Sequence, residues 1–230
     1  MKFFPRAARL RSEMMYAIHE CDICRALNPD LSVRIARLGE PDILHRNHYL
    51  GGRYENLYVT LQTLPEMRVI LEAAQRAAAD LLERAEASLH VGWWLNVMRP
   101  GEITHAHTHD AADELLSGVY YVDVPSNSGR LIMQRGERRE EVKPRAGTFV
   151  FFAPDVLHEV TRNGSNRMRV SVGLNFGPAD APANVVKKTR KQRSAPMPNP
   201  AVSLGVANPE LNVQTRKILR AHYAAKYRTR

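Results

Sequence analysis

The sequence predicts a mainly β protein with flanking helices, folded as a double-stranded β-helix, that is, a jelly-roll or cupin-like barrel. Two observations support this class. From residue 91 to residue 176 the chain consists of short runs rich in Val, Ile, Tyr, Phe and Trp, separated by clusters of Pro, Gly, Asn and Ser. No helical segment interrupts them, and eight such runs in succession are typical of a jelly roll. They lie near residues 93–98, 103–109, 117–124, 130–134, 140–143, 148–152, 158–161 and 167–176.

A helix is expected immediately before the strands. Thr63 and Glu66 have the spacing of a capping box, and Pro65 between them suits a first helical turn. Over residues 65–90, apolar side chains recur on one helical stripe. Its members are Met67, Ile70, Leu71, Ala74, Ala78, Leu81, Leu82, Ala85 and Leu89. This stripe predicts a helix that packs against the sheet.

The chain is expected to form one folded unit with two extensions. Its 230 residues suit a single domain, and 44% apolar residues are enough for a buried core. Residues 1–62 are predicted to form an N-terminal extension of mixed structure, with a helix around 6–26 and a turn at Gly51–Gly52. Residues 63–176 carry the helix and the catalytic barrel, and residues 177–230 form a basic, proline-rich arm with a C-terminal helix.

The net charge of +9 lies entirely in that arm. Residues 1–176 hold 22 basic and 22 acidic side chains, whereas residues 177–230 hold 11 basic and 2 acidic ones. The arm is therefore expected either to be a solvated linker or to attract an acidic partner such as nucleic acid. A third alternative is that Ile218, Leu219 and Tyr223 dock its final helix on the barrel or on a second subunit, as in a homo-oligomer.

Hydropathy and cysteine content indicate a cytoplasmic protein without a membrane partner. No apolar run approaches the roughly 20 residues that cross a bilayer. Cys21 and Cys24 are the only cysteines, which argues against a disulfide framework and fits a reducing compartment. Together with His45 and His48, the same pair has the ligand types of a zinc site.

Histidines at alternate positions indicate a metal site in the barrel. The segment THAHTH places His105, His107 and His109 two residues apart, and residues two apart in a strand point to the same side. Neutral imidazoles are common metal ligands. His158, in a later strand-like run, supplies a further ligand once the two strands lie side by side.

The last predicted strand has one apolar and one polar face. The apolar face is formed by Met168, Val170, Val172, Leu174 and Phe176, and the polar face by Arg167, Arg169, Ser171, Gly173 and Asn175. The polar face either meets solvent, as in most antiparallel sheets, or lines the mouth of the barrel. In the second case Arg169 would hold a carboxylate with its planar fork, and Ser171 would add a hydrogen bond.

Four sequence blocks carry a resemblance to a known family. WWLNVMRPGEITHAHTH, LLSGVYYVDVP, PRAGTFVFFAPDVLHEV and RMRVSVGLNF follow one another over about residues 92–176. In this order they resemble a family of 2-oxoglutarate/Fe(II)-dependent oxygenases known mostly from bacterial and phage sequences. The resemblance implies a jelly-roll barrel that holds Fe(II) near its mouth and binds 2-oxoglutarate on that iron.

The resemblance also assigns roles to individual residues. His107 and His109 match the early metal ligands of the family, and His158 matches the distal one. Arg169 matches the arginine that binds the far carboxylate of 2-oxoglutarate, with Ser171 completing an RxS element. Asn96 and Tyr121, or its neighbour Tyr120, occupy strands that contribute cosubstrate contacts in the family. His105 then stays outside the ligand set, because only two ligands from one strand fit comfortably around one ion.

One departure from the family leaves alternatives open. The usual oxygenase triad is two histidines and one carboxylate, and here His109 stands at the carboxylate position. The first hypothesis is a 2-oxoglutarate-dependent hydroxylase of unknown substrate. The second is a cupin-type metalloenzyme that does not use 2-oxoglutarate, since Gly101, His107, His109 and Glu114 follow the first cupin motif. The third is a non-enzymatic binding module that acts through its basic tail.

Overall fold

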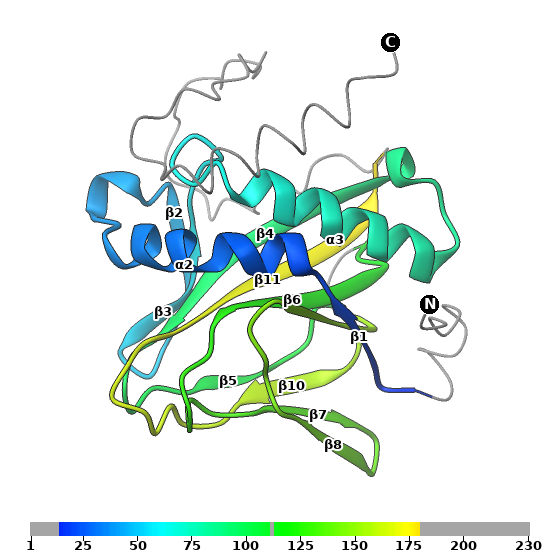
Figure 1. Ribbon diagram of the computed structural model, residues 1–230. Helices are drawn as coiled ribbons and strands as arrows, with labels where there is room; N and C mark the ends of the chain where they lie inside the picture. Colours follow the sequence, from blue (N-terminus) through cyan, green and yellow to red (C-terminus); the bar gives the residue numbers. More distant parts are fainter. Residues whose placement is uncertain (1–13, 111–112, 180–230) are drawn as a thin grey trace, which may run out of the picture.

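The computed structural model describes residues 14–110 and 113–179. Its strands form two antiparallel sheets, and two helices lie over the outer face of the larger sheet (Figure 1). The elements in chain order are β1 (Tyr16–Glu20), α2 (Asp22–Ala36), the short helix η1 (Glu40–Asp42), β2 (His45–Leu50), β3 (Arg53–Tyr58), α3 (Met67–Leu82), the short helix η2 (Glu86–Ser88), β4 (Leu89–Met98), β5 (Thr104–His107), β6 (Leu116–Asp123), β7 (Leu131–Arg135), β8 (Arg138–Val142), β9 (Thr148–Phe152), β10 (Leu157–Val160) and β11 (Arg169–Pro178).

The predicted double-stranded β-helix is confirmed. Each of the eight strand-like runs forms a strand, β4 to β11. These strands are shared between the larger sheet, in the order β1-β9-β6-β11-β4-β3-β2, and the smaller sheet, in the order β5-β10-β7-β8. Because most connections from β4 onward pass from one sheet to the other, the two sheets enclose a common interior, as in a jelly roll.

The predicted helix before the barrel is α3, and it is shorter than expected. Its buried side chains, among them Met67, Ile70 and Ala74, belong to one core with Val172 and Leu174 of β11. The helix stops at residue 82 because Glu83 adopts a left-handed conformation (φ 53°). The predicted extension to residue 90 is wrong.

The predicted capping box does not form. The backbone N–H of Thr63 donates to Thr60 Oγ1, and the carboxylate of Glu66 turns inward to lie 3.2 Å from Arg34 Nε of α2. Glu66 is fully buried, and burial raises the pKa of its carboxyl group. A buried carboxylate needs a charged partner, so the ion pair with α2 replaces the local cap.

Within the N-terminal segment, the predicted helix over residues 6–26 is wrong for residues 16–20. Residues 16–20 form β1, which pairs with β9, and the helix α2 begins only at Asp22. The remainder of the predicted helix, residues 6–13, lies outside the described residues. The predicted turn at Gly51–Gly52 is confirmed, and both glycines have positive φ. It joins β2 to β3, so three strands of the N-terminal segment belong to the larger sheet.

The predicted zinc site is also wrong. Cys21 and Cys24 form a disulfide at the start of α2, so no thiolate remains for a metal. The only group of potential ligands within bonding range of one ion, among the described residues, does not include His45 or His48. The expectation of a reducing compartment rested on the low number of cysteines, which argued against disulfides, and the Cys21–Cys24 disulfide removes this support.

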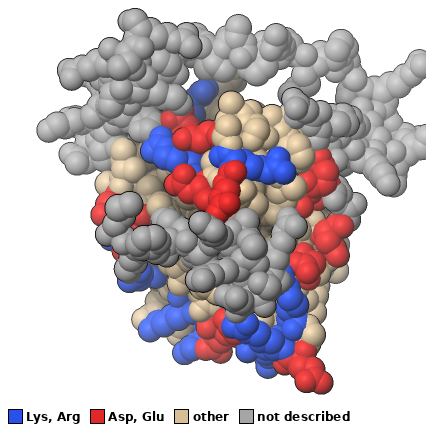
Figure 2. Space-filling view, turned by 90° about the vertical axis from the view of Figure 1, so that its right-hand side faces the viewer, with Lys and Arg blue, Asp and Glu red and all other residues tan. Residues whose placement is uncertain are grey.

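The surface of the described part carries charges of both signs. On the face shown in Figure 2, Lys and Arg side chains lie next to Asp and Glu side chains. This agrees with the even charge balance of residues 1–176. Among residues 14–110 and 113–179, no helix is long and apolar enough to cross a membrane. The predicted basic arm and its final helix lie outside the described residues from position 180 onward.

Candidate metal centre

Three of the predicted ligands come together inside the barrel. His107 on β5 and His158 on β10 are direct cross-strand partners in the smaller sheet, and their ring centroids lie 4.3 Å apart. His109 follows the end of β5, where its backbone N–H donates to the carbonyl of Pro154 at 2.8 Å. One nitrogen from each of the three rings lies within 4.8 Å of the others. This spacing suits three ligands of one ion.

Hydrogen bonds orient two of the rings toward the common centre. Nδ1 of His107 lies 2.7 Å from the carbonyl oxygen of His105, and Nδ1 of His158 lies 2.9 Å from that of Val156. A carbonyl oxygen only accepts, so each Nδ1 carries the hydrogen and donates it. The lone pair of each Nε2 is then available for a metal.

Burial keeps the three imidazoles neutral. Burial, with a smaller contribution from the neighbouring histidines, lowers the pKa of His109 and of His158 to about 3. Burial also lowers the pKa of His107. A metal ion binds the unprotonated ring, so at neutral pH no proton has to leave before it binds.

The other predicted site residues face the histidines from the larger sheet. Ser171 on β11 pairs with Asn96 on β4 and with Tyr121 on β6, and Arg169 lies two residues before Ser171 on the same face. These four side chains and the three histidines line one cavity. The polar face of β11 is therefore turned into the barrel, and the alternative that it meets solvent is wrong.

Among residues 14–110 and 113–179, Arg169 is a buried cation without an anionic partner. Its side chain is 1% exposed, Nη1 donates to the carbonyl of Ser128 at 3.2 Å, and the guanidinium lies 5.3 Å above the ring of Tyr121. Its Nε and the hydroxyl of Tyr121 are both buried and make no hydrogen bond within the described residues. Burial lowers the pKa of Arg169, and Tyr121 partly opposes this. An uncompensated buried charge is costly, so the arrangement favours an anion beside Arg169.

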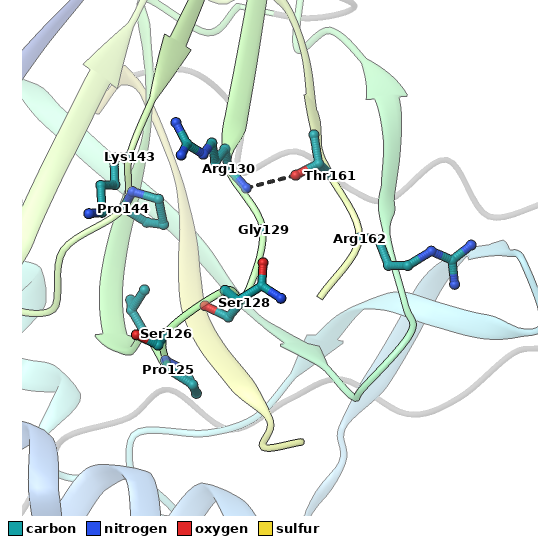
Figure 3. A pocket seen from close by; sticks show the side chains of 11 residues that line it. Pro125, Ser126, Ser128, Gly129, Arg130, Lys143, Pro144, Thr161 and Arg162 are labelled. Atoms are coloured by element: carbon teal, nitrogen blue, oxygen red, sulfur yellow. Dashed lines mark hydrogen bonds between the residues drawn. The ribbon is translucent and has the colours of Figure 1, made fainter. Parts of the chain in front are cut away.

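A tight loop holds the carbonyl group that Arg169 contacts. Arg130 N donates to Thr161 Oγ1 at 2.9 Å, as Figure 3 shows, and Gly129 has φ +88°. A Cβ atom on Gly129 would overlap the carbonyl of Thr161, so only glycine fits there. The same loop also lines a second cavity of about 440 Å³ (Figure 3). That cavity contains none of the predicted site residues, which all line the smaller one.

Several residues of the cavity wall escape prediction from the sequence. They are Asn56, Trp94, Thr104 and Phe152. Trp94 covers Gly173, where any Cβ atom would overlap the indole, and its ring lies 5.5 Å from that of His109. A glycine in the middle of a strand often marks such a close approach, so Gly173 was the available signal.

Two acidic residues that follow the histidines in the sequence, Asp110 and Glu114, stay outside the ligand group. Asp110 accepts a hydrogen bond from Thr108 Oγ1 at 2.6 Å and does not join the histidines. Glu114, the glutamate of the cupin motif, neither belongs to the group nor lines the cavity. His105 is absent from the group as well, as expected, and its ring bonds to Glu55 instead.

Fold and site together define a jelly-roll protein with a partly buried group of three histidines that faces a buried arginine. Within this chain, residues 92–142, less than a quarter of its length, match the family model described as "Putative 2OG-Fe(II) oxygenase". The matched segment contains His107 and His109 but ends before His158 and Arg169. A search of curated proteins found no match.

Solved structures of oxygenases share the fold. A prolyl-4-hydroxylase from Pseudomonas putida is 20% identical with a TM-score of 0.58, over 74% of this chain and 96% of that one. A 2OG-Fe(II) oxygenase family oxidoreductase from Burkholderia pseudomallei is also 20% identical, with a TM-score of 0.54 over 74% and 87%. A prolyl hydroxylase from Trichoplax adhaerens, solved with a peptide fragment of hypoxia inducible factor, is 11% identical with a TM-score of 0.57 over 74% and 86%.

Proposed function

We propose that the protein is a 2-oxoglutarate-dependent Fe(II) oxygenase that hydroxylates a substrate still to be identified. The observation that carries this proposal is the unpaired Arg169 in the cavity that also holds three neutral histidines. A metal centre and an unpaired cation on opposite walls match a ligand that binds metal at one end and carries a carboxylate at the other. The family match over residues 92–142 and the shared fold point to the same activity.

The residues present fit both groups. Fe(II) would be held by His107, His109 and His158, because imidazole nitrogen is a suitable ligand for iron. The far carboxylate of 2-oxoglutarate would lie at Arg169, where Nε and the hydroxyl of Tyr121 are donors that find no acceptor in the described part of the chain. Ser171 and Asn96 are placed beside it on adjacent strands. When bound, the iron and 2-oxoglutarate would supply the oxidising chemistry.

The side chains of the protein itself would position the ligands and exclude water from the cavity. The Nδ1 hydrogen bonds fix the rings of His107 and His158 before any ligand arrives. Trp94 and Phe152 close the cavity with apolar surface, which strengthens every charge interaction inside it. The metal-binding cupin hypothesis has less support, since Glu114 lies outside both the histidine group and the cavity wall, and since that hypothesis gives Arg169 no role.

Metal and cosubstrate binding test the proposal directly. Protein prepared without oxygen and loaded with Fe(II) should hold one ion per chain, and His107→Ala and His158→Ala should each abolish this stoichiometry. The parent should consume 2-oxoglutarate in an iron-dependent reaction, because uncoupled turnover needs no identified substrate. Metal content that survives both substitutions would rule out the centre. Iron binding without 2-oxoglutarate binding would favour the cupin alternative.

We also propose that the basic C-terminal arm attracts an acidic partner. The supporting observation is the excess of 11 basic over 2 acidic side chains after residue 176. Because β11 runs to Pro178 and Ala179 N donates to Ser88 at 2.9 Å, the arm should be removed after residue 179. The truncated protein should keep its metal and lose salt-sensitive binding to an RNA oligonucleotide. A changed oligomeric state, or unchanged RNA binding, would count against this role.

A further inference from the structure

We propose that Glu55 is a positioning residue of the metal centre and supplies, through His105 and His107, the negative charge that a three-histidine ligand set lacks. This inference rests on the proposed metal site. It concerns a residue of β3, far from the barrel strands in sequence, that no motif singles out.

Glu55 is bound to His105 at two points. Its carboxylate oxygen Oε1 accepts from the backbone N–H of His105 at 2.9 Å and lies 2.8 Å from Nδ1 of the same residue. Glu55 is 1% exposed, so water does not compete for this oxygen. The ring and the peptide group of residue 105 are therefore held together by one buried carboxylate.

His105 passes this constraint to a ligand. Its carbonyl oxygen accepts the hydrogen bond from Nδ1 of His107 at 2.7 Å. The contacts therefore run from the carboxylate of Glu55 to residue 105, and from residue 105 to the ring of His107, whose Nε2 faces the centre. A partner behind a ligating histidine fixes its orientation and increases its strength as a donor to the metal. Here that partner is a carbonyl group whose own residue is fixed by Glu55.

The rest of the hairpin holds Glu55 in place. Arg53 on the same strand donates to the carbonyls of Val97 and Ile103 and pairs with Glu102, which joins β3 to the segment before β5. At the turn, Gly51 has φ +58° and lies against the ring of His105, where a Cβ atom would come within 3.0 Å of Cε1. The hairpin therefore clamps His105 from two sides.

The chemical consequence concerns charge. Two histidines and a carboxylate bring one negative charge to iron, whereas three neutral histidines bring none. The carboxylate of Glu55 is not a ligand, yet it lies behind His105 inside the protein, where charges act over longer range than in water. This negative charge should stabilise the bound divalent ion, and it should stabilise Fe(III) more than Fe(II).

Glu55→Gln separates charge from shape. Glutamine is nearly isosteric, and its amide oxygen can accept the same two hydrogen bonds, but the negative charge is lost. We expect the affinity for Co(II), used as the probe ion, to fall about 10- to 100-fold. The Fe(III)/Fe(II) potential should shift to a more positive value. Glu86→Gln is the control, because Glu86 forms an exposed ion pair with Arg76 and belongs neither to the hairpin nor to the cavity wall; its affinity should stay within about twofold.

The outcomes distinguish this inference from the proposed site. If Glu55→Gln binds Co(II) as tightly as the parent and at the same iron potential, Glu55 has no such role, although the three-histidine site stands. If the parent binds no ion, or His158→Ala still binds it, both ideas fail. Should the glutamine variant unfold early, Glu55→Asp keeps the charge and decides the question. A potential close to the parent's supports the charge role, and a shift as large as that expected for glutamine contradicts it.

Discussion

At the scale of single residues, the histidines and the arginine of the cavity each keep one protonation state near neutral pH. The histidines are neutral at neutral pH because their pKa values are lowered, whereas the lowered pKa of Arg169 still leaves a cation. The cavity thus offers lone pairs on one wall and a positive charge on the other. A ligand is selected by satisfying both.

Replacing Arg169 with lysine should weaken 2-oxoglutarate binding by at least about tenfold. Lysine keeps the charge but loses the planar fork and its stacking on Tyr121. Isothermal titration of the metal-loaded protein measures the effect. Arg167→Lys is the control, since Arg167 lies near the same strand but is exposed and pairs with Asp123 at 2.8 Å. Equal affinity in parent and Arg169→Lys would refute the role of Arg169.

Gly173→Ala should destabilise the protein by roughly 1–3 kcal/mol and disturb the site. The added Cβ would overlap the indole of Trp94, which lies beside His109, and overpacking of a filled interior has about this cost. Urea denaturation followed by tryptophan fluorescence gives the value. Gly92→Ala on the paired strand is the control, because its nearest neighbour lies at 3.9 Å. Similar losses in both variants would show that close approach at Gly173 is unimportant.

The residues that sequence analysis could place share a strand. Alternation alone puts Arg169 and Ser171 on one face, and likewise His107 and His109, because the period of two fixes the side of each residue. Glu55 and Trp94 contribute to the site by contacting residues that lie on other strands. Their part in the site depends on which strands pair, and no local pattern encodes that.

At the scale of elements, β5 is the weakest part of the metal centre. It has four residues, lies at the edge of the smaller sheet, and pairs with β10 through an irregular register. A metal ion would join His107 to His158 across this pairing. The bound ion would thus stabilise a strand that has few residues with which to pair.

Metal should slow amide hydrogen exchange in β5 selectively. Local opening of an edge strand becomes more costly when a bound ion links it to its neighbour. Exchange measured by mass spectrometry with and without Co(II) should show protection over residues 104–107. The strand β8 at the opposite edge of the same sheet carries no ligand and serves as the internal control. Equal protection of both edges would indicate general stabilisation instead.

The elements differ in how far the sequence predicted them. All barrel strands were predictable because apolar runs broken by turn residues leave few alternatives. The prediction of an early helix failed because the short run YAIHE is stabilised more by pairing with β9 than it would be by forming a helix. This is an effect of tertiary structure. The end of the helix near residue 83 was not predicted, because a glutamate that adopts the left-handed conformation has no signature in the sequence.

At the scale of the whole molecule, the buried histidines make stability depend on pH. Folded pKa values near 3 lie below the unfolded value of about 6.5, so between these pH values the unfolded chain binds more protons. The contribution of these histidines to the stability of the metal-free protein is therefore fully present above about pH 6.5. It is lost as the pH drops toward 3. The slope should be about 1 kcal/mol per pH unit for each such histidine.

Denaturant titrations across that pH range check this dependence. A variant with leucine at positions 109 and 158 should show a flatter profile than the parent, because two of the groups that take up protons on unfolding are gone. A parent profile that is flat between pH 6.5 and 4 would show that these rings are not neutral in the folded protein.

The proposed metal ion and anion would be held by different sheets. His107 and His158 belong to the smaller sheet, and Arg169 and Ser171 to the larger one. A ligand that reaches from the ion to the arginine therefore spans the interior and braces one sheet against the other. Thermodynamic reciprocity then applies: the factor by which the ion tightens that ligand must equal the factor by which the ligand tightens the ion. Whatever separates the two sheets, at any distance from the cavity, weakens both partners at once.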